Sequence, residues 1–218
     1  MKRCVVAIDG PAGAGKSTVA QIAAKKLGYT YIDTGAMYRA VAWKALQKKE
    51  PVTDELILSV LPDIVIDLRY EDGKTQVFVD GQEVTAEIRT PEINKIVSQV
   101  AMLGPVREKL VELQRKMAER GSVLMDGRDI ATHVLPDADV KIFLTASIEA
   151  RASRRAKELR EKGYDVNPEE IRRDIAERDR KDSEREISPL MQAEDAVLLD
   201  TTALSIDEVV EKILGMCR

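Results

Sequence analysis

Five short apolar runs alternate along this chain with segments of helical spacing. Each run has the length of a buried parallel strand, and together they cover residues 4–8, 29–32, 122–125, 140–144 and 196–199. After the first run, apolar side chains recur three or four residues apart, as at Val19, Ile22 and Ala23. Strands that alternate with helices predict an α/β fold, in which helices cover both faces of a parallel sheet in three layers.

A different pattern interrupts this alternation. Residues 64–84 alternate apolar and polar side chains and contain two Asp-Gly pairs, at positions 72–73 and 80–81. Period-two alternation broken by Asp-Gly turns predicts a small antiparallel meander. We interpret it as an insertion on the α/β core over residues 51–90. The alternative is an edge hairpin of the main sheet.

Two helical stretches complete the predicted architecture. Residues 91–120 have helical spacing with a break at Gly104-Pro105, which predicts two helices or one interrupted helix. Residues 148–187 hold 12 basic and 12 acidic side chains, so we expect a solvated, weakly packed segment that acts as a mobile helical lid. The predicted division is a core over 1–50, 91–147 and 188–218, an insertion over 51–90 and a lid over 148–187.

Composition narrows the class of protein only slightly. With 44% hydrophobic and 33% charged residues, the 218-residue chain has the composition of a globular protein. Its net charge of −4 argues against non-specific binding to nucleic acid or anionic membranes, and no apolar run approaches a membrane span. Cys4 and Cys217 are the two cysteines, a number that suits a reducing compartment. We therefore expect a cytoplasmic protein with no nucleic-acid or membrane partner. We also expect a monomer, although composition does not bear on oligomeric state.

The stretch GPAGAGKST, residues 10–18, lies between the first predicted strand and the first predicted helix. It matches G-x-x-x-x-G-K-[ST], a P-loop, in the strand–turn–helix setting that this motif requires. Because glycines lack a β-carbon, the loop can curl until its N–H groups converge on one anion at a helix N-terminus. Lys16 can reach the β- and γ-phosphates of a nucleoside triphosphate, and the Ser17 hydroxyl can coordinate Mg²⁺. The predicted nucleotide-binding residues are Gly10, Pro11, Ala12, Gly13, Ala14, Gly15, Lys16, Ser17 and Thr18.

Other interpretations of the loop explain less of it. A plain glycine turn explains neither the lysine nor the hydroxyl, and a dinucleotide site has its glycines in G-x-G-x-x-G order. A GTPase would need an Asn-Lys-x-Asp stretch, which the sequence lacks. A motor or transporter ATPase usually has a clear catalytic carboxylate at a strand end, which Asp126 could imitate, but Gly-Arg-Asp follows it at once. The class that remains is a small kinase.

Arginine placement favours a kinase whose acceptor is itself phosphorylated. Arg39 follows DTGAMY, and Arg128 follows the third core run, at the sheet edge where ligands of open α/β sheets bind. Phosphoryl transfer passes through a highly charged transition state and needs such cations, and a lid that carries them also excludes water. The alternative is solvated helices with ion pairs between neighbouring turns. Two further sets have spacings that place each set on one helix face: Arg151, Arg154 and Arg155, and Arg178, Asp182 and Arg185.

Six stretches together resemble the bacterial cytidylate kinase family, one of the nucleoside monophosphate kinases of the P-loop class. They are AIDGPAGAGKST, YIDTGAMYRA, SQVAMLGPVRE, MDGRDIATHVLPDADVKIFLTAS, RDRKDSER and DTTALSIDEVV. They span nearly the whole chain, and the insertion at 51–90 lies where that family has its monophosphate-binding domain. The resemblance implies transfer of the γ-phosphoryl group of Mg-ATP to CMP or dCMP.

The resemblance also implies roles for individual residues. It places at the acceptor's α-phosphate Thr34, Arg39, Arg128 and Arg185. It places around the cytosine Ser98, Arg107 and Asp129, and at the sugar Arg178 and Asp182. The cations expected to neutralise charge during transfer are Lys16, Arg128 and the lid arginines Arg154 or Arg155. The family often has serine where this chain has Thr34, and a hydroxyl is kept.

The assignment of the base agrees with hydrogen-bonding chemistry. Cytosine has an amino donor at N4, which Asp129 can accept, and acceptors at N3 and O2, to which Arg107 and Ser98 can donate. Uracil presents an acceptor where cytosine has its donor, and an unpaired buried polar group costs about 1–3 kcal/mol. We therefore predict a strong preference for cytosine over uracil. Ser98 and Asp129 are also compatible with a helix-face hydroxyl or a helix cap.

Some alternatives stay open at this point. The same motifs are compatible with a P-loop kinase that uses a different monophosphate acceptor, and with a non-catalytic nucleotide-binding regulatory domain. Either Asp126 or Asp33 can support the water shell of the metal. His133, the one histidine of the chain, follows Gly-Arg-Asp, but transfer to an anionic phosphate needs no strong general base. We interpret His133 as a packing or surface residue, and Tyr38 and Trp43 as core or wall residues.

Overall fold

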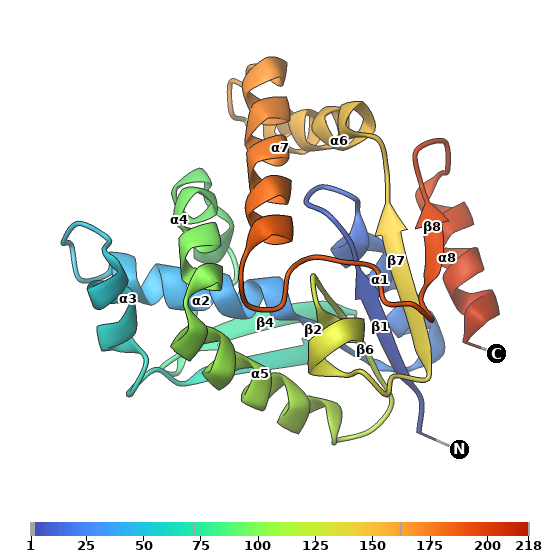
Figure 1. Cartoon of the computed structure of the whole chain (residues 1–218), viewed down its shortest axis with the longest axis horizontal. Coiled ribbons are helices and arrows are strands. Elements are labelled where there is room, and N and C mark those ends of the chain that lie inside the picture. Colours follow the sequence, from blue (N-terminus) through green and yellow to red (C-terminus); the bar gives the residue numbers. More distant parts are fainter. Residues whose placement is uncertain (1–2, 72, 162, 218) are drawn as a thin grey trace.

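A five-stranded parallel sheet forms the centre of the protein in the computed structural model, which describes residues 3–71, 73–161 and 163–217 (Figure 1). Its strands lie in the order β2-β6-β1-β7-β8, and every neighbouring pair is parallel. They are β1 (Val5–Asp9), β2 (Thr30–Asp33), β6 (Val123–Gly127), β7 (Val140–Thr145) and β8 (Val197–Asp200). The five apolar runs therefore form the predicted strands, each beginning within one residue of its expected position.

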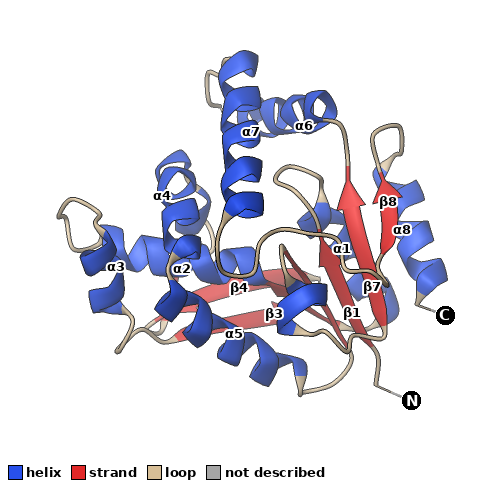
Figure 2. Cartoon of the chain, in the orientation of Figure 1, coloured by secondary structure: helices blue, strands red, loops and turns tan. Residues whose placement is uncertain are grey.

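Helices cover both faces of this sheet, as the alternating pattern predicts (Figure 2). On one face, α1 (Lys16–Leu27) and α8 (Ile206–Met216) bury their aliphatic side chains against Ile8, Leu124 and Ile142. On the other face, α5 (Gly104–Ala118) and the short helix η2 (Ile130–Val134) pack against Ala7, Ile32 and Met125. Burying apolar surface on both sides is what makes near-continuous apolar strands favourable.

The meander forms a sheet of its own. Strands β3 (Ile66–Glu71), β4 (Lys74–Val79) and β5 (Gln82–Glu83) pair antiparallel with one another, so the alternative of an edge hairpin of the main sheet is wrong. Asp80 and Gly81 both have positive φ, at 52° and 83°, which matches a tight hairpin turn. Asp72, in the other Asp-Gly pair, lies outside the described residues.

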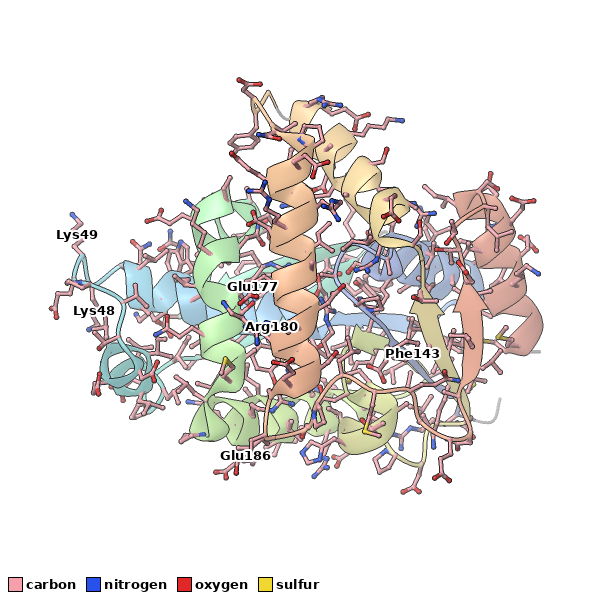
Figure 3. The ribbon with its side chains drawn as sticks, turned by 45° about the horizontal axis from the view of Figure 1, so that its top comes forward. Lys48, Lys49, Phe143, Glu177, Arg180 and Glu186 are labelled. Carbon is pink, nitrogen blue, oxygen red and sulfur yellow. The ribbon has the colours of Figure 1, made fainter. Side chains whose placement is uncertain are left out.

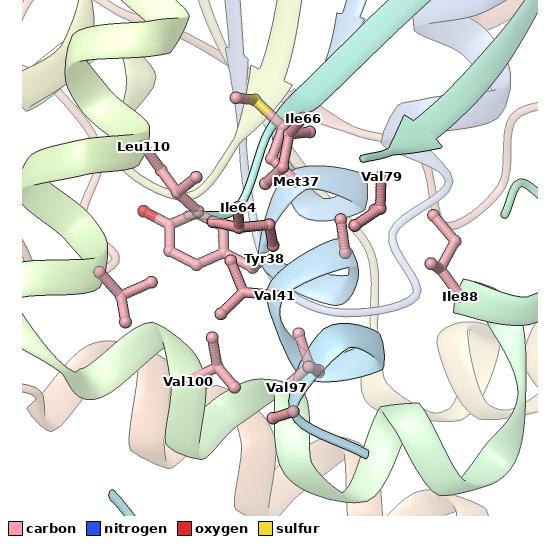
Figure 4. Packing of buried hydrophobic residues seen from close by; sticks show 14 of the residues in the cluster. Met37, Tyr38, Val41, Ile64, Ile66, Val79, Ile88, Val97, Val100 and Leu110 are labelled. Atoms are coloured by element: carbon pink, nitrogen blue, oxygen red, sulfur yellow. The ribbon is translucent and has the colours of Figure 1, made fainter. Parts of the chain in front are cut away.

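A second hydrophobic core joins this small sheet to the helices beside it. Helices α2 (Thr34–Leu46), α3 (Asp54–Val60), α4 (Pro91–Met102) and the 3₁₀ turn η1 (Glu87–Arg89) surround it. Figure 4 shows Tyr38 among Met37, Val41 and Leu110, and Trp43 packs against the same cluster, so both aromatic residues belong to the core. Leu103, with extended backbone, separates α4 from α5, so the predicted break yields two helices.

The charged segment forms two helices that stand over the carboxyl ends of the strands (Figure 1). Helices α6 (Ile148–Glu161) and α7 (Pro168–Glu184) share a small apolar cluster of Ala152, Ala156, Ile171 and Ile175. Their other side chains are largely charged and exposed, as the sequence indicates. None of the helices in the described part of the chain has the length and apolar character needed to cross a bilayer.

Candidate active site

A cleft of about 940 Å³ lies at the carboxyl ends of the parallel strands. The glycine-rich loop after β1 forms its floor, and residues from α2, α4, α6 and α7 form its walls. The predicted site residues that line it are Ala12, Gly13, Ala14, Gly15, Lys16, Ser17, Thr18, Arg39, Ser98, Arg128, Arg154, Arg155 and Arg178. The structure thus brings the P-loop, both lid helices, and the helices α2 and α4 that carry Arg39 and Ser98 to one cavity.

Positive φ angles show why the loop is rich in glycine. Gly10, Gly13 and Gly15 have φ of 148°, 73° and 91°, which other residues rarely adopt. A β-carbon on Gly10 would also lie 1.9 Å from the carbonyl oxygen of Leu144, which no side chain can avoid. Helix α1 begins at Lys16, and no capping side chain accepts from its first N–H groups. Those groups and the positive end of the helix dipole suit a phosphate.

Lys16 lies folded onto the loop. Its ammonium donates hydrogen bonds to the carbonyls of Gly10 and Pro11, at 2.7 and 2.8 Å. The side chain is buried, and burial, reinforced by the nearby Arg128 charge, holds the pKa of Lys16 well below its usual range. An anion in the cleft would therefore be attracted to a cation that burial has left poorly solvated.

Two carboxylates stand behind the loop, and they are engaged differently. Asp126 accepts hydrogen bonds from the Ser17 hydroxyl at 3.0 Å and from the Tyr31 hydroxyl at 2.7 Å. Burial, together with the charge of Asp33, raises the pKa of Asp126 to about 6. Asp33 instead caps helix α2 through the Ala36 N–H and pairs with Arg89 at 2.9 Å. Only Asp126 of the two contacts the hydroxyl predicted to hold Mg²⁺.

The arginines that line the cleft are crowded together. Burial, and then repulsion from Arg128 and Arg39, lowers the pKa of Arg178 to about 9. Burial also lowers the pKa of Arg39. The Nε of Arg178 is buried and donates no hydrogen bond. Desolvated cations of like charge are a ready site for a multiply charged anion such as a phosphate.

Four other predicted acceptor residues form a buried cluster behind the cleft surface: Arg107, Asp129, Asp182 and Arg185. Arg107 forms an ion pair with Asp129, and Arg185 Nη2 lies 3.4 Å from the second oxygen of that carboxylate. Asp182 accepts from Arg128 Nε at 2.9 Å, which joins this cluster to the cleft. The Arg107 guanidinium also lies 5.7 Å from the centre of the Tyr38 ring.

The remaining predicted residues have clear partners. The Thr34 hydroxyl donates to the carbonyl of Asp126 at 2.7 Å, so Thr34 ties helix α2 to the end of β6. Arg154 donates to the carbonyl of Thr201 at 2.6 Å, and Arg155 pairs with Glu158 at 2.7 Å. His133 is exposed, in agreement with its interpretation as a surface residue.

Asp9 is a buried residue of the site that the sequence analysis missed. Its carboxylate accepts hydrogen bonds from the N–H groups of Ile130 and Ala131, at 2.8 and 2.7 Å. Burial raises the pKa of Asp9 to about 6. These bonds fix the turn that carries Arg128 and Asp129. The available signal was a carboxylate at the end of an otherwise apolar strand.

Fold and site together define a small kinase of the P-loop class. Solved structures with a similar fold include an uncharacterized protein from Eubacterium ventriosum ATCC 27560, with a TM-score of 0.52 and 13% identity over 98% of this chain and 97% of that one. A gluconokinase from Sinorhizobium meliloti 1021 has a TM-score of 0.50 and 16% identity, covering 99% and 93%. At these identities the likeness concerns the fold alone.

Closer relatives identify the family. The family model described as cytidylate kinase matches residues 6–218. Proteins named cytidylate kinase from Bacillus thuringiensis (strain Al Hakam), Bacillus cereus (strain AH187) and Bacillus anthracis (strain CDC 684 / NRRL 3495) are each 54% identical over 216 residues. These matches cover 99% of this chain and 96% of each relative. The chain belongs to the cytidylate kinase family, which confirms the resemblance found in the sequence.

Proposed function

We propose that this protein transfers the γ-phosphoryl group of Mg-ATP to CMP or dCMP, yielding ADP and CDP or dCDP. The observation that carries the proposal is the group of buried arginines, Arg39, Arg128 and Arg178, that lines the same cleft as the glycine-rich loop and its Lys16. Such a cleft suits two anionic nucleotides placed end to end. Membership of the cytidylate kinase family supports cytidine as the acceptor nucleoside.

The donor binds at the loop in this proposal. The N–H groups of residues 13–18 surround the β- and γ-phosphates of ATP, and Lys16 exchanges its two carbonyl partners for phosphate oxygens. The Ser17 hydroxyl would bind Mg²⁺, and Asp126, which contacts Ser17, would support the water shell of the ion. We assign this role to Asp126 rather than Asp33 because Asp126 contacts Ser17, whereas Asp33 caps a helix and binds Arg89. Mg²⁺ commonly binds through few protein oxygens and the substrate phosphates, whose charge it neutralises.

The acceptor binds on the opposite side of the cleft. The phosphate of CMP is held by Arg39, Arg128 and Arg185, with the Thr34 hydroxyl beside them. Arg178 and Asp182 hold the sugar. The base lies against the buried Arg107–Asp129 pair, so that Asp129 accepts from N4 while Arg107 and Ser98 donate to N3 and O2. Arg107 and Asp129 bind each other, and each has further hydrogen-bonding capacity. A base that offers both a donor and an acceptor can satisfy that remaining capacity.

The transfer itself follows from this placement. The acceptor phosphate is already an anion, so an in-line attack on the γ-phosphorus needs alignment and charge neutralisation rather than a general base. Lys16 and Arg128, with Arg154 or Arg155 from the lid, stabilise the charge that develops on the transferred group. Lid helices that close over the cleft exclude water, which would otherwise compete with CMP as the acceptor.

Initial-rate measurements of ADP release test the proposal. Purified protein with Mg-ATP should release ADP at a rate that rises and saturates with added CMP, while release without CMP stays near background. Binding of ATP with no CMP-dependent release would favour the alternative of a regulatory nucleotide-binding domain. Release that responds to another acceptor but not to CMP or dCMP would favour a P-loop kinase of different specificity. Monomeric state and cytoplasmic location stay predictions.

A further inference from the structure

The peptide group of Ala12, inside the P-loop, is held at both ends by side chains of the lid. The N–H of Ala12 donates to Asp179 Oδ1 on α7 at 2.9 Å. Its carbonyl accepts from Arg151 Nη1 on α6, also at 2.9 Å. Arg151 and Asp179 in turn form an ion pair with each other. Two lid residues and one loop residue thus make a closed ring of interactions.

This ring is part of a wider contact between loop and lid. Arg151 is buried, and its Nε donates to the carbonyl of Ala146 at 2.9 Å, which fixes the start of α6. A β-carbon on Gly13 would lie 3.4 Å from the β-carbon of Arg151 and 3.6 Å from Ile175 Cδ1. Both lid helices therefore pack directly against the turn at Gly13, where the phosphate-binding amides begin.

The position of Ala12 makes this contact consequential. Ala12 lies between Gly10 and Gly13, whose positive φ angles set the curl of the loop. A glycine-rich backbone has many accessible conformations, so external hydrogen bonds are needed to select one. The interactions that select it here come from residues 139 and 167 positions away in sequence.

We propose that Arg151 and Asp179 are positioning residues that hold the P-loop in its ATP-binding shape and make tight ATP binding depend on docking of the lid helices. The inference rests on the proposed function only in taking ATP as the ligand of the loop. Arg151 does not act on phosphate in this account. It differs in this from Arg154 and Arg155, which share its helix but line the cleft.

Calorimetric titrations test the proposal, with ATP and CMP titrated separately into the full chain. Asp179→Ala and Arg151→Met should each weaken ATP binding about tenfold to a hundredfold, the effect of losing a hydrogen bond to a charged group. CMP affinity should stay within about twofold of the original value. The double variant should bind ATP no more weakly than the worse single variant, because both changes open the same ring.

The matched control is an exposed ion pair on α7, the helix that carries Asp179. It joins Glu169 to Arg172 at 3.3 Å. Glu169→Gln and Arg172→Met should leave ATP affinity unchanged. If Asp179→Ala does not fold, Asp179→Asn keeps an oxygen for the Ala12 N–H while losing the ion pair, and should weaken ATP binding to a smaller extent.

The outcomes separate the two proposals. Folded variants that bind ATP as tightly as the original chain would overturn the inference, and so would an equal loss of ATP and CMP affinity. Failure of the unaltered chain to bind ATP would instead overturn the proposed function.

Discussion

The cations on the cleft surface and those in the buried cluster behind it are neutralised in different ways. Lys16 donates to main-chain carbonyls and no carboxylate accepts a hydrogen bond from its ammonium among the described residues, although a buried guanidinium nitrogen without an acceptor occurs in both groups, at Arg178 and at Arg107. In the buried cluster, Arg107 and Arg185 share the carboxylate of Asp129. The first group holds positive charge that an anion can satisfy, which gives affinity for phosphates. The second, counted with Asp182, has two arginines and two carboxylates, although Asp182 also binds Arg128. It offers a fixed donor and acceptor pattern, which gives selectivity for a base.

Breaking the buried pair should have the largest effect. Arg107→Met leaves the Asp129 carboxylate with only the longer contact to Arg185, and removing one partner of a buried ion pair costs about 3–5 kcal/mol of folding free energy. The variant should also lose most of its affinity for CMP. Urea unfolding measures the first effect and calorimetry the second.

An exposed ion pair is the control for this change. Lys116→Met removes the partner of Glu112 on the outer face of α5, where solvent screens such pairs and their loss changes stability little. Equal destabilisation by Arg107→Met and Lys116→Met would contradict the difference drawn between the two regions.

Removing the cleft cation should affect turnover rather than stability. Lys16→Ala is expected to lower kcat about 10²–10³-fold, as does loss of one donor to a developing oxyanion, while the affinity for CMP changes little. Lys48, in the turn that follows α2, provides the control (Figure 3), because Lys48→Ala removes an equal charge far from the cleft. Steady-state kinetics that show only a raised KM for ATP, with kcat unchanged, would count against a role in the transfer.

The raised pKa of Asp126 predicts a dependence of stability on pH. Its pKa is about 6 in the folded chain against 3.8 as the ordinary value, so the native state binds the proton more tightly. Stability of the ligand-free protein should therefore fall as pH rises from about 4 through 6, by roughly 3 kcal/mol for this group. Asp126→Asn should remove that part of the decline and also abolish activity.

Asp9 has the same raised pKa, so part of the decline should persist in Asp126→Asn. Urea unfolding at a series of pH values without nucleotide measures both contributions. A decline of unchanged size in Asp126→Asn would show that Asp126 does not titrate in this range.

The smallest effect is expected at Thr34. Thr34→Ser keeps the hydroxyl that donates to the Asp126 carbonyl, so kcat/KM for CMP should change less than about threefold. Thr34→Val has nearly the same shape but leaves that carbonyl without its donor, and should cost about 1–3 kcal/mol in stability or CMP binding. Equal activity of the serine and valine variants would show that the Thr34 hydroxyl does not contribute to CMP binding or turnover.

The sequence predicted those parts of the fold that depend on local pattern. The apolar runs located the strands, and the glycine spacing located the phosphate-binding loop, because strand burial and positive φ leave their mark on neighbouring residues. Local sequence pattern does not show which distant strand or side chain will be the partner. Period-two alternation therefore could not decide whether β3 and β4 pair with the main sheet.

The same limit applies to the candidate site. Two of its hydrogen bonds join residues more than a hundred positions apart in sequence. The Ile130 N–H donates to Asp9, and the Ala12 N–H donates to Asp179. Regular spacing placed Arg151 on one helix face with Arg154, but spacing cannot say that Arg151 is buried against Ala12, whereas Arg154 lines the cleft and reaches the Ala14 carbonyl at 3.4 Å. That distinction required the packing of α6 against the core.

The ratio of kcat/KM for CMP to kcat/KM for UMP is the sharpest check on the proposed role of the Arg107–Asp129 pair. Uracil has an oxygen in place of the amino group that faces Asp129, and its N3 carries a proton where cytosine N3 accepts. CMP should be preferred at least about tenfold, as expected when a buried carboxylate meets an amino group in one case and an oxygen in the other. Equal turnover of CMP and UMP would contradict that role.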